Sequence, residues 1–435
     1  MRYRQIHNIW AVCVSDAPAT GYCYADYNGT KHNNPNLTPF DENLLKPIDR
    51  VTAFTYGFNI DRTNITQLGV RGLIDRAIVN RPDIQVNFNY WSVGVRNESR
   101  IGLVVNYNNA SGSPIFSSDQ CCFNNLTGQD TDSRNVFVAV SPDNTDLNNN
   151  IKGINQDALI HPSDLFVFGF GNCYLNSYQT RAAVGQLPQT SVGYVCSNIV
   201  GYTSGSGANI PAVYSKSGNL VNGTYFTIPR VVSSTTPSVI RPKDIVLQIS
   251  DINSTYSNDA TWGISSSGLA IQSFDLAVNL TREDLRTVGH ILPVDRRVNF
   301  PILATVNIGS IIDNNYSGNL SQILDRNKSY DITVNMYNPS CSFSGREIAV
   351  QYKLKNAKFE SVSYDYGIGN NLVGNFGFSA EIDVHNPNKG LFISGLLNEQ
   401  LPEYPYNYLV LGNNATGFFF LDDGNLLIVN ETSIV

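Results

Sequence analysis

Residues that could carry catalysis or bind a metal are few in this sequence and lie far apart. The five histidines form no HxH or HExxH pattern and stand at no metal-ligand spacing. The sequence has no Gly-x-Ser-x-Gly nucleophile elbow, no GxxxxGK phosphate loop and no carboxylate pair that stands out for glycoside cleavage. We therefore expect no enzyme, no cofactor, and neither catalytic nor metal-binding residues.

Two groups of residues come closest to a metal or redox site. Asp130, Asp132, Asp143 and Asp146 could offer carboxylates to calcium, but their spacing misses that of an EF-hand loop. The seven cysteines contain no CxxC motif. An odd number of widely spaced cysteines fits free buried thiols better than a disulfide framework. They are Cys13, Cys23, the adjacent Cys121 and Cys122, Cys173, Cys196 and Cys341.

The most attractive polar residues are a charged pair that occurs twice, Asp75-Arg76 and Asp295-Arg296. Two interpretations are equally open. Each pair could make charge-assisted contacts with a neighbouring subunit, which makes these four residues the candidate subunit-interface site. Alternatively, each pair could close a turn within its own part of the chain.

Both pairs lie at equivalent places in two matching segments. Residues 51–87 read VTAFTYGFNIDRTNITQLGVRGLIDRAIVNRPDIQVN, and residues 271–307, at an offset of 220, read IQSFDLAVNLTREDLRTVGHILPVDRRVNFPILATVN. A second match follows at an offset of 184, where Asn172, Ser177, Gly185 and Gly193 meet Asn356, Ser361, Gly369 and Gly377. Two matches in the same order predict two copies of one domain.

The elements that position these residues are predicted to be mainly strands. Residues 84–95 alternate, with Ile84, Val86, Phe88 and Tyr90 on one side. A short helix is expected in each copy, over residues 61–69 and 319–326, and a terminal hairpin is expected to pair 417–421 with 425–429. The fold class is two tandem β-sandwich or barrel domains with extended arms. The predicted parts are an N-terminal arm (1–50), repeat 1 (51–200, with a surface insertion at about 96–134), a linker (201–266), repeat 2 (267–385) and a C-terminal β tail (386–435).

Composition narrows the function classes. With 42% apolar and 15% charged residues, the chain favours strands and uncharged hydrogen-bonding surfaces. A net charge of −7 argues against a dedicated nucleic-acid binder. No apolar stretch is long enough to span a bilayer, and the first residues are interpreted as a strand rather than a signal peptide.

The repeated segments FNIDRTNITQLG…IDR and VNLTREDLRTVG…VDR, together with the later stretch from NPSCSFSGREIAVQYKLK to GNFGFSAEI, resemble the duplicated major tail tube proteins of long-tailed (siphophage-type) bacteriophages. The resemblance covers about two-thirds of the chain. It implies tail-tube-like domains whose strands join between neighbours around a channel, with three chains supplying six domains to each ring. The final 50 residues depart from the family because they are too short for an outer immunoglobulin-like domain.

The resemblance therefore implies a structural virion protein located in the tail and made in the host cytoplasm. Its partners would be copies of itself in stacked homotrimeric rings, other tail proteins, and double-stranded DNA that passes without specific binding during ejection; no membrane insertion is expected. A low charge suits a conduit that should not hold phosphates. Two alternatives stay open: a related distal-tail or baseplate ring protein, and a surface β protein that binds glycans or receptors. A glycan-cleaving tail enzyme lacks a convincing acid/base pair.

The subunit-interface interpretation makes a direct prediction for the two aspartates. Asp75→Ala or Asp295→Ala should weaken assembly more than it affects folding of the monomer, because each change removes one partner of a charge-assisted contact between chains. Sedimentation combined with thermal unfolding measures both quantities. Normal polymerisation by both variants would remove the interface role from these pairs.

Overall fold

The computed structural model of the 435-residue chain is built almost entirely from antiparallel strands. It describes residues 7–16, 24–25, 31–32, 46–78, 83–106, 121–126, 133–142, 166–202, 208–209, 225–226, 239–251, 269–285, 288, 295–312, 329–338, 348–365, 373–383, 386, 389–395, 416–420 and 426–430.

The elements of the first part of the chain include one short helix. They are β1 (His7–Asp16), β2 (Tyr24–Ala25), β3 (Lys31–His32), β4 (Lys46–Pro47), β5 (Val51–Asn59), β6 (Arg62–Ile65), β7 (Asp75–Ile78), β8 (Asp83–Trp91), α1 (Arg96–Arg100), β9 (Val105–Asn106), the 3-10 turn η1 (Asn124–Leu126), β10 (Ser133–Pro142), β11 (Phe166–Ala183), β12 (Gln189–Cys196) and β13 (Asn198–Tyr202).

The later elements repeat much of this series. They are β14 (Ala208–Asn209), β15 (Tyr225–Phe226), the 3-10 turn η3 (Pro242–Asp244), β16 (Ile245–Asp251), β17 (Leu269–Asn279), β18 (Arg282–Leu285), β19 (Asp295–Val298), β20 (Leu303–Ile312), β21 (Tyr330–Tyr337), β22 (Ile348–Asp365), β23 (Val373–Glu381), β24 (Gly390–Gly395), β25 (Thr416–Phe420) and β26 (Leu426–Asn430).

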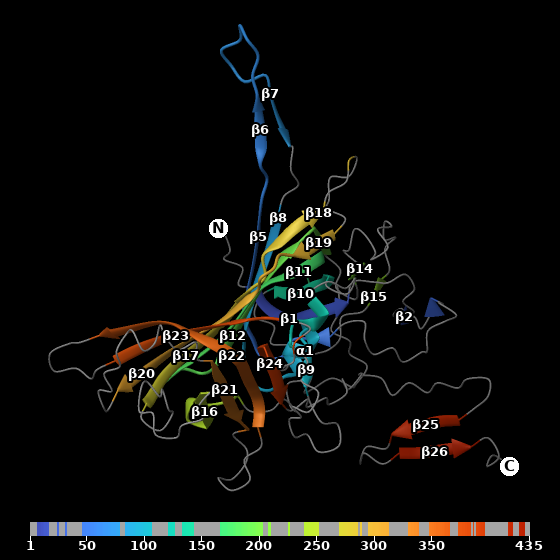
Figure 1. Cartoon of the computed structure of the whole chain (residues 1–435). Helices are drawn as coiled ribbons and strands as arrows, with labels where there is room; N and C mark the ends of the chain where they lie inside the picture. Colours follow the sequence, from blue (N-terminus) through green and yellow to red (C-terminus); the bar gives the residue numbers. More distant parts are fainter. Residues whose placement is uncertain are drawn as a thin grey trace, which may run out of the picture.

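Eight strands form a continuous central sheet in the order β5-β8-β12-β11-β17-β20-β23-β22 (Figure 1). Every neighbouring pair in this sheet is antiparallel. The first four strands come from the first matching part of the sequence and the last four from the second. The sheet therefore crosses from one half to the other at a single junction, between β11 and β17.

The matched sequence segments occupy equivalent strands in the two halves. The bounds of β6 and β7 become those of β18 and β19 when 220 is added. The irregularity in pairing at Val51/Ala53 recurs at Ile271/Ser273, and that at Leu175/Ser177 recurs at Phe359/Ser361. The two halves therefore share strand order and register, while their origin from one duplicated domain stays a prediction.

A bend in one long strand of each half creates a second layer. Asn172 in β11 and Asn356 in β22 have positive φ angles of 48° and 58°, in the left-handed region that asparagine tolerates better than most residues. Up to the bend β11 pairs with β10 and β13, and β22 pairs with β21 and β24; the pairing with β10 and β21 continues for one or two residues past it. After it, both strands enter the central sheet.

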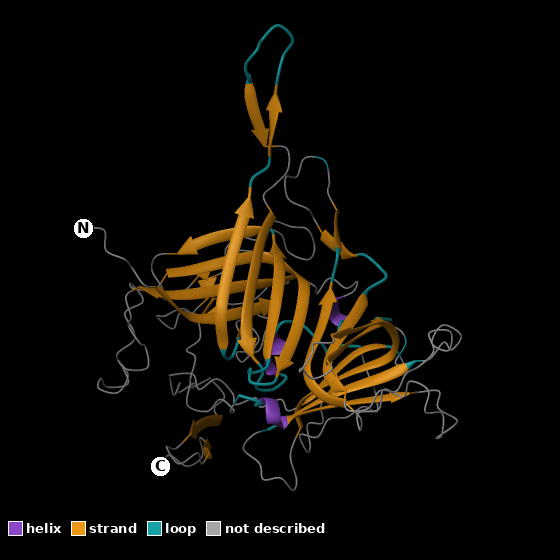
Figure 2. Cartoon of the chain, turned by 90° about the vertical axis from the view of Figure 1, so that its left-hand side faces the viewer, coloured by secondary structure: helices purple, strands orange, loops and turns teal. Residues whose placement is uncertain are grey.

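The second layers pack against the central sheet, as the crossing strands in Figure 2 illustrate. The ring of Tyr56 on β5 lies 5.3 Å from that of Phe170 on β11, although these segments do not pair. In the second half Tyr330 on β21 stands edge-on to Phe378 on β23 at 5.7 Å. Buried side chains from both halves belong to one hydrophobic cluster. The halves therefore share a core, and the predicted β-sandwich character is confirmed.

Several sequence expectations are confirmed in detail. Along β8 the side chains of Ile84, Val86, Phe88 and Tyr90 are buried, and the residues between them face away from the core. The terminal hairpin exists, with β25 paired to β26. The strand expected near the start of the sequence is β1 (His7–Asp16), which pairs with β10.

Other expectations are wrong. Residues 61–69 are not helical, because their apolar side chains belong to the projecting β6–β7 hairpin. The insertion is not confined to the surface: Ile101, Leu103 and Phe123 are buried, and β9 pairs with β24 of the second half. The GLFISG segment is the buried strand β24 rather than part of a separate tail. The helix expected over 319–326 and the four aspartates considered for calcium lie outside the described residues.

The bend in β22 gives a stability prediction. Asn356→Ala should lower the free energy of unfolding by about 1 kcal/mol, because a Cβ without a compensating polar group is unfavourable at positive φ, whereas Asn356→Gly should be nearly neutral. Urea denaturation of both variants measures the difference. Equal losses for alanine and glycine would show that the asparagine side chain, and not its backbone conformation, is required.

Candidate functional site: the edges and junction of the central sheet

The junction between β11 and β17 shows how one half of the chain binds the other. Seven residue pairs align, from Ser177 opposite Asn279 to Ala183 opposite Ser273. The backbone contact extends past both ends of the ladder, since Leu280 N donates to Asn176 O at 2.7 Å and Val184 N donates to Gln272 O at 2.9 Å. Each half thus supplies one edge strand to the other.

Side chains strengthen this junction on both sides. The amide Nε2 of Gln179 lies 2.8 Å from each carboxylate oxygen of Asp275, a hydrogen bond to an ionised acceptor. The guanidinium of Arg282 donates from Nε to Leu175 O at 3.0 Å and lies 5.2 Å above the ring of Tyr174. These contacts link β17 and the β18–β19 hairpin to the segment of β11 that follows its bend.

The junction also removes apolar side chains from water. Leu276, Val278 and Leu280 in the second half are each 1% exposed. Their counterparts in the first half are Tyr56, Phe58 and Ile60, which are 45%, 56% and 38% exposed. The residue type is apolar at each position in both halves, so the difference arises from what covers them. Among the described strands, β5 has β8 on one side and no strand on the other to do so.

The strands at the two outer edges of the central sheet are the sequence counterparts of the two strands that pair at its centre. Among the described strands β5 pairs with β8 alone. At the other end, residues 358–365 of β22 pair with β23, and no described strand lies along their second side. β5 is the counterpart of β17, and this part of β22 is the counterpart of the part of β11 that binds β17. Exposed edges of this kind are templates for pairing with another chain.

The face of the central sheet opposite the core carries mainly small, uncharged polar side chains, with Asp275 and Arg181 as an oppositely charged pair among them. A shallow depression on it is lined mainly by residues of this kind from four neighbouring strands, namely Asn87, Asn89, Ser177, Gln179, Ser191 and Asn279. The second half repeats the pattern: an added Cβ at Gly193 would meet Ser177 and Asn87, and one at Gly377 would meet Ser361 and Asn307. A face with this composition offers hydrogen bonds but little net charge.

The four candidate interface residues lie in the second strands of two hairpins, at the end next to the connecting loop. Arg76 on β7 is exposed and donates from Nε to Asn64 at 3.0 Å. Asp75 accepts a hydrogen bond from the Arg76 backbone N at 2.7 Å. The β6–β7 hairpin, here called the first arm, projects far beyond the rest of the protein (Figures 1 and 2). The structure does not bring Asp75 and Arg76 close to Asp295 and Arg296.

The equivalent β18–β19 hairpin, here called the second arm, has a different environment. Arg296 is only 3% exposed; its Nε lies 2.9 Å from Asp284, the counterpart of Asn64, and its Nη2 lies 3.2 Å from Asp83 on β8. Arg296 therefore links the second arm to the first half of the same chain. Asp295 begins β19 opposite Leu285. Neither of the two interpretations offered from the sequence describes Arg296 fully, because its contact crosses between halves without leaving the chain.

A buried polar cluster, which the sequence analysis missed, lies where the two halves share their core. The carboxylate of Glu98 on α1 is fully buried, and its Oε1 accepts hydrogen bonds from the hydroxyl groups of Tyr90, Tyr178 and Tyr352 at 3.0, 3.3 and 3.5 Å. The Tyr178 and Tyr352 hydroxyl groups also lie 3.0 Å apart. Tyr352 belongs to the second half, so this cluster joins the halves around a residue of the insertion.

Burial dominates the electrostatics of this cluster. Removal from water raises the pKa of Glu98 to about 7, although hydrogen bonds from its backbone and the three tyrosines lower it. Burial likewise raises the pKa of Tyr90 and Tyr178, whose phenolate forms would also lie beside Glu98. The local sequence Glu98-Ser99-Arg100 gives no hint of such a site. Its members come from three distant segments.

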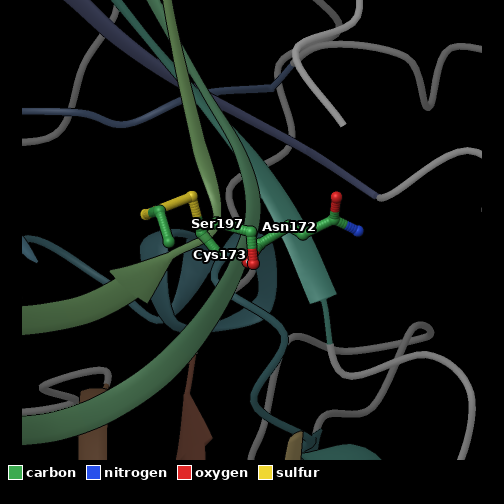
Figure 3. The surroundings of a disulfide bond; sticks show 4 residues. Asn172, Cys173 and Ser197 are labelled. Atoms are coloured by element: carbon green, nitrogen blue, oxygen red, sulfur yellow. A yellow bond between two sulfur atoms is a disulfide. The ribbon is translucent and has the colours of Figure 1, made fainter. Parts of the chain in front are cut away.

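Two of the cysteines are joined, contrary to the expectation of free thiols. Cys173, just after the bend in β11, and Cys196, at the end of β12, form a disulfide across 23 residues (Figure 3). The Ser197 hydroxyl reaches the Asn172 backbone O at 3.5 Å beside it. Cys13, Cys121 and Cys122 are free and buried, as expected, and the remaining two cysteines lie outside the described residues. Sequence spacing could not show that antiparallel pairing brings 173 and 196 together.

Comparisons with known proteins do not assign this chain to a family. No protein-family model matches the chain, and no curated protein is significantly similar to it. In the described part of the chain no group of three His, Cys, Asp or Glu side chains is placed to hold a metal ion. No helix among the described residues has the length and hydropathy of a membrane span.

Glu98 makes the stability of this protein depend on pH in a defined direction. Because its pKa in the folded state is raised to about 7, above the ordinary value of 4.5, its stabilising effect is complete below about pH 4.5. That effect should be lost as the pH rises to about 7, by about 3 kcal/mol in total. Urea denaturation between pH 4.5 and 8 measures this decline.

Glu98→Gln tests the assignment, because a neutral amide of the same size cannot ionise. The variant should lose this pH-dependent component and be more stable than the wild type at pH 8. Glu98→Ala is the control, since it leaves three tyrosine hydroxyl groups near a cavity and should be destabilising at every pH. An unchanged pH profile in Glu98→Gln would assign the dependence to other groups.

Proposed function

We propose that this chain is a structural virion protein that polymerises, as three-chain rings with six equivalent half-chains, into the tail tube of a long-tailed bacteriophage. The observation that carries the proposal is the pair of outer edges, β5 and the end of β22, which are the counterparts of the strands that meet at the β17–β11 junction. A chain with such edges can repeat its internal junction with the next chain. Heterologous contacts of this kind make a ring when the rotation closes.

The exposure of apolar residues supports the same assembly. Tyr56, Phe58 and Ile60 lie on the β5 edge and its continuation, and their counterparts are buried at the internal junction, where a neighbouring half is present. Covering these three side chains would remove apolar surface from water, the main favourable term in association. A closed ring would also leave no sheet edge exposed to further, uncontrolled pairing.

The polar face suits the wall of a DNA conduit. If the sheet closes with its core layer outward, the side chains of Asn87, Ser177 and Gln179 and their counterparts face the channel. Uncharged groups neither release counterions from DNA nor attract its phosphates strongly. The duplex would then pass without the salt-dependent binding that a basic wall produces.

Electron microscopy of the purified chain tests the proposal, with a matched pair of variants as the control. Wild-type protein should form rings or tubes. Phe58→Asp should abolish them while leaving thermal unfolding of the monomer within a few degrees of wild type, because Phe58 is 56% exposed in the single chain.

Val278→Asp, at the equivalent position of the internal junction, should instead prevent stable folding, since it buries an unpaired charge. A wild-type chain that remains monomeric in microscopy and sedimentation at high concentration would contradict the proposed assembly. Discrete monomers that bind glycans would favour the surface-binding alternative.

A further inference from the structure

The two arms are equivalent in sequence but not in environment. The second arm lies against the first half of the chain, whereas the first arm extends away from the body (Figure 1). Much of the exposed apolar side-chain surface belongs to the first arm and its base, including Ile60, Ile65, Leu73, Ile74 and Ile78. Such a hairpin is a surface that another molecule is expected to cover.

We infer that the first arm binds a second copy of this chain, at the segment following the bend in β22, in the position that the second arm takes on β11. This inference rests on the proposed assembly and names the surfaces that meet in it. The contacts of the second arm, and of Leu280 just before it, define the expected geometry. Two of them use backbone acceptors just after the β11 bend: Leu280 N to Asn176 O, and Arg282 Nε to Leu175 O.

The corresponding residues can reproduce both contacts. Ile60 replaces Leu280 and Arg62 is identical to Arg282, while Glu360 and Phe359 stand in the places of Asn176 and Leu175. The acceptors are backbone carbonyls, so these substitutions do not remove them. The partner's bend also has the same left-handed backbone, at Asn356 rather than Asn172.

One change in sequence adds an attractive contact to the predicted interface. Where the internal junction has the neutral Asn176, the second half has Glu360, an exposed carboxylate on β22. The guanidinium of Arg62 would approach this residue as it reaches the Phe359 carbonyl. A second change would weaken the interface, because Lys358 replaces Tyr174 and places a positive charge near Arg62. The ammonium group of Lys358 donates to Ser329 Oγ at 2.7 Å within its own half. We therefore assign Arg62 and Glu360 as the charged pair between chains.

The test compares three arginine variants in assembly and in folding. Arg62→Ala should raise the protein concentration needed for assembly about tenfold, the effect of losing one charge-assisted hydrogen bond of about 1.4 kcal/mol, with no change in the unfolding temperature of the monomer. Arg282→Ala should lower that temperature, because its contacts lie within the chain. Arg71→Ala, at the tip of the first arm, should change neither quantity.

Charge reversal identifies the partner residue. Arg62→Glu and Glu360→Arg should each impair assembly, and the double variant should recover most of it. Rescue in the double variant would support the pairing.

Three results would overturn the inference. The first is that Arg62→Ala assembles at the same protein concentration as the wild type. The second is that the double variant fails to recover assembly. The third is that Arg62→Ala lowers the stability of the monomer as much as Arg282→Ala does. If the wild type still forms tubes, any of these three results would reject the Arg62–Glu360 contact but leave the proposed function intact. A wild-type chain that never associates would overturn both.

Discussion

The structure of this protein depends on one antiparallel ladder, the seven residue pairs between β11 and β17. It turns two four-stranded sheets into one sheet of eight strands and closes over Leu276, Val278 and Leu280. Without it, each half would present a free edge and an uncovered apolar row. The ladder therefore holds the two halves of the chain together, and it is also the template for the proposed contact between chains.

Three other features reinforce the junction from different directions. Arg282 and Arg296 attach the second arm to the first half, and the insertion places Glu98 among tyrosines from both halves. The common core makes independent unfolding of the halves unfavourable. A rigid relation between the halves is what a ring requires, since a small error in the angle at each junction would accumulate before the ring closes.

The contrast between matched residues gives the functional argument its strength. Phe58 and Val278 are both apolar and occupy the same strand position, yet one is exposed and the other buried. Propensity does not differ enough to explain this, because both residues favour strands. The lack of a second described strand beside β5 does explain it, and the proposed ring supplies such a strand. The two arms show the same contrast: Arg282 contacts β11 of its own chain, whereas its counterpart Arg62 is exposed.

The sequence by itself determined what depends on local pattern: the alternation along β8, the terminal hairpin and the two matching series of segments. Local pattern failed at residues 61–69, where an apolar spacing typical of a helix belongs to a hairpin that stands clear of the core. Only the tertiary structure decided which strands join the halves, which cysteines pair and that Glu98 is buried. Those outcomes depend on segments brought together over long separations, and no local sequence signal specifies the partner in such a contact.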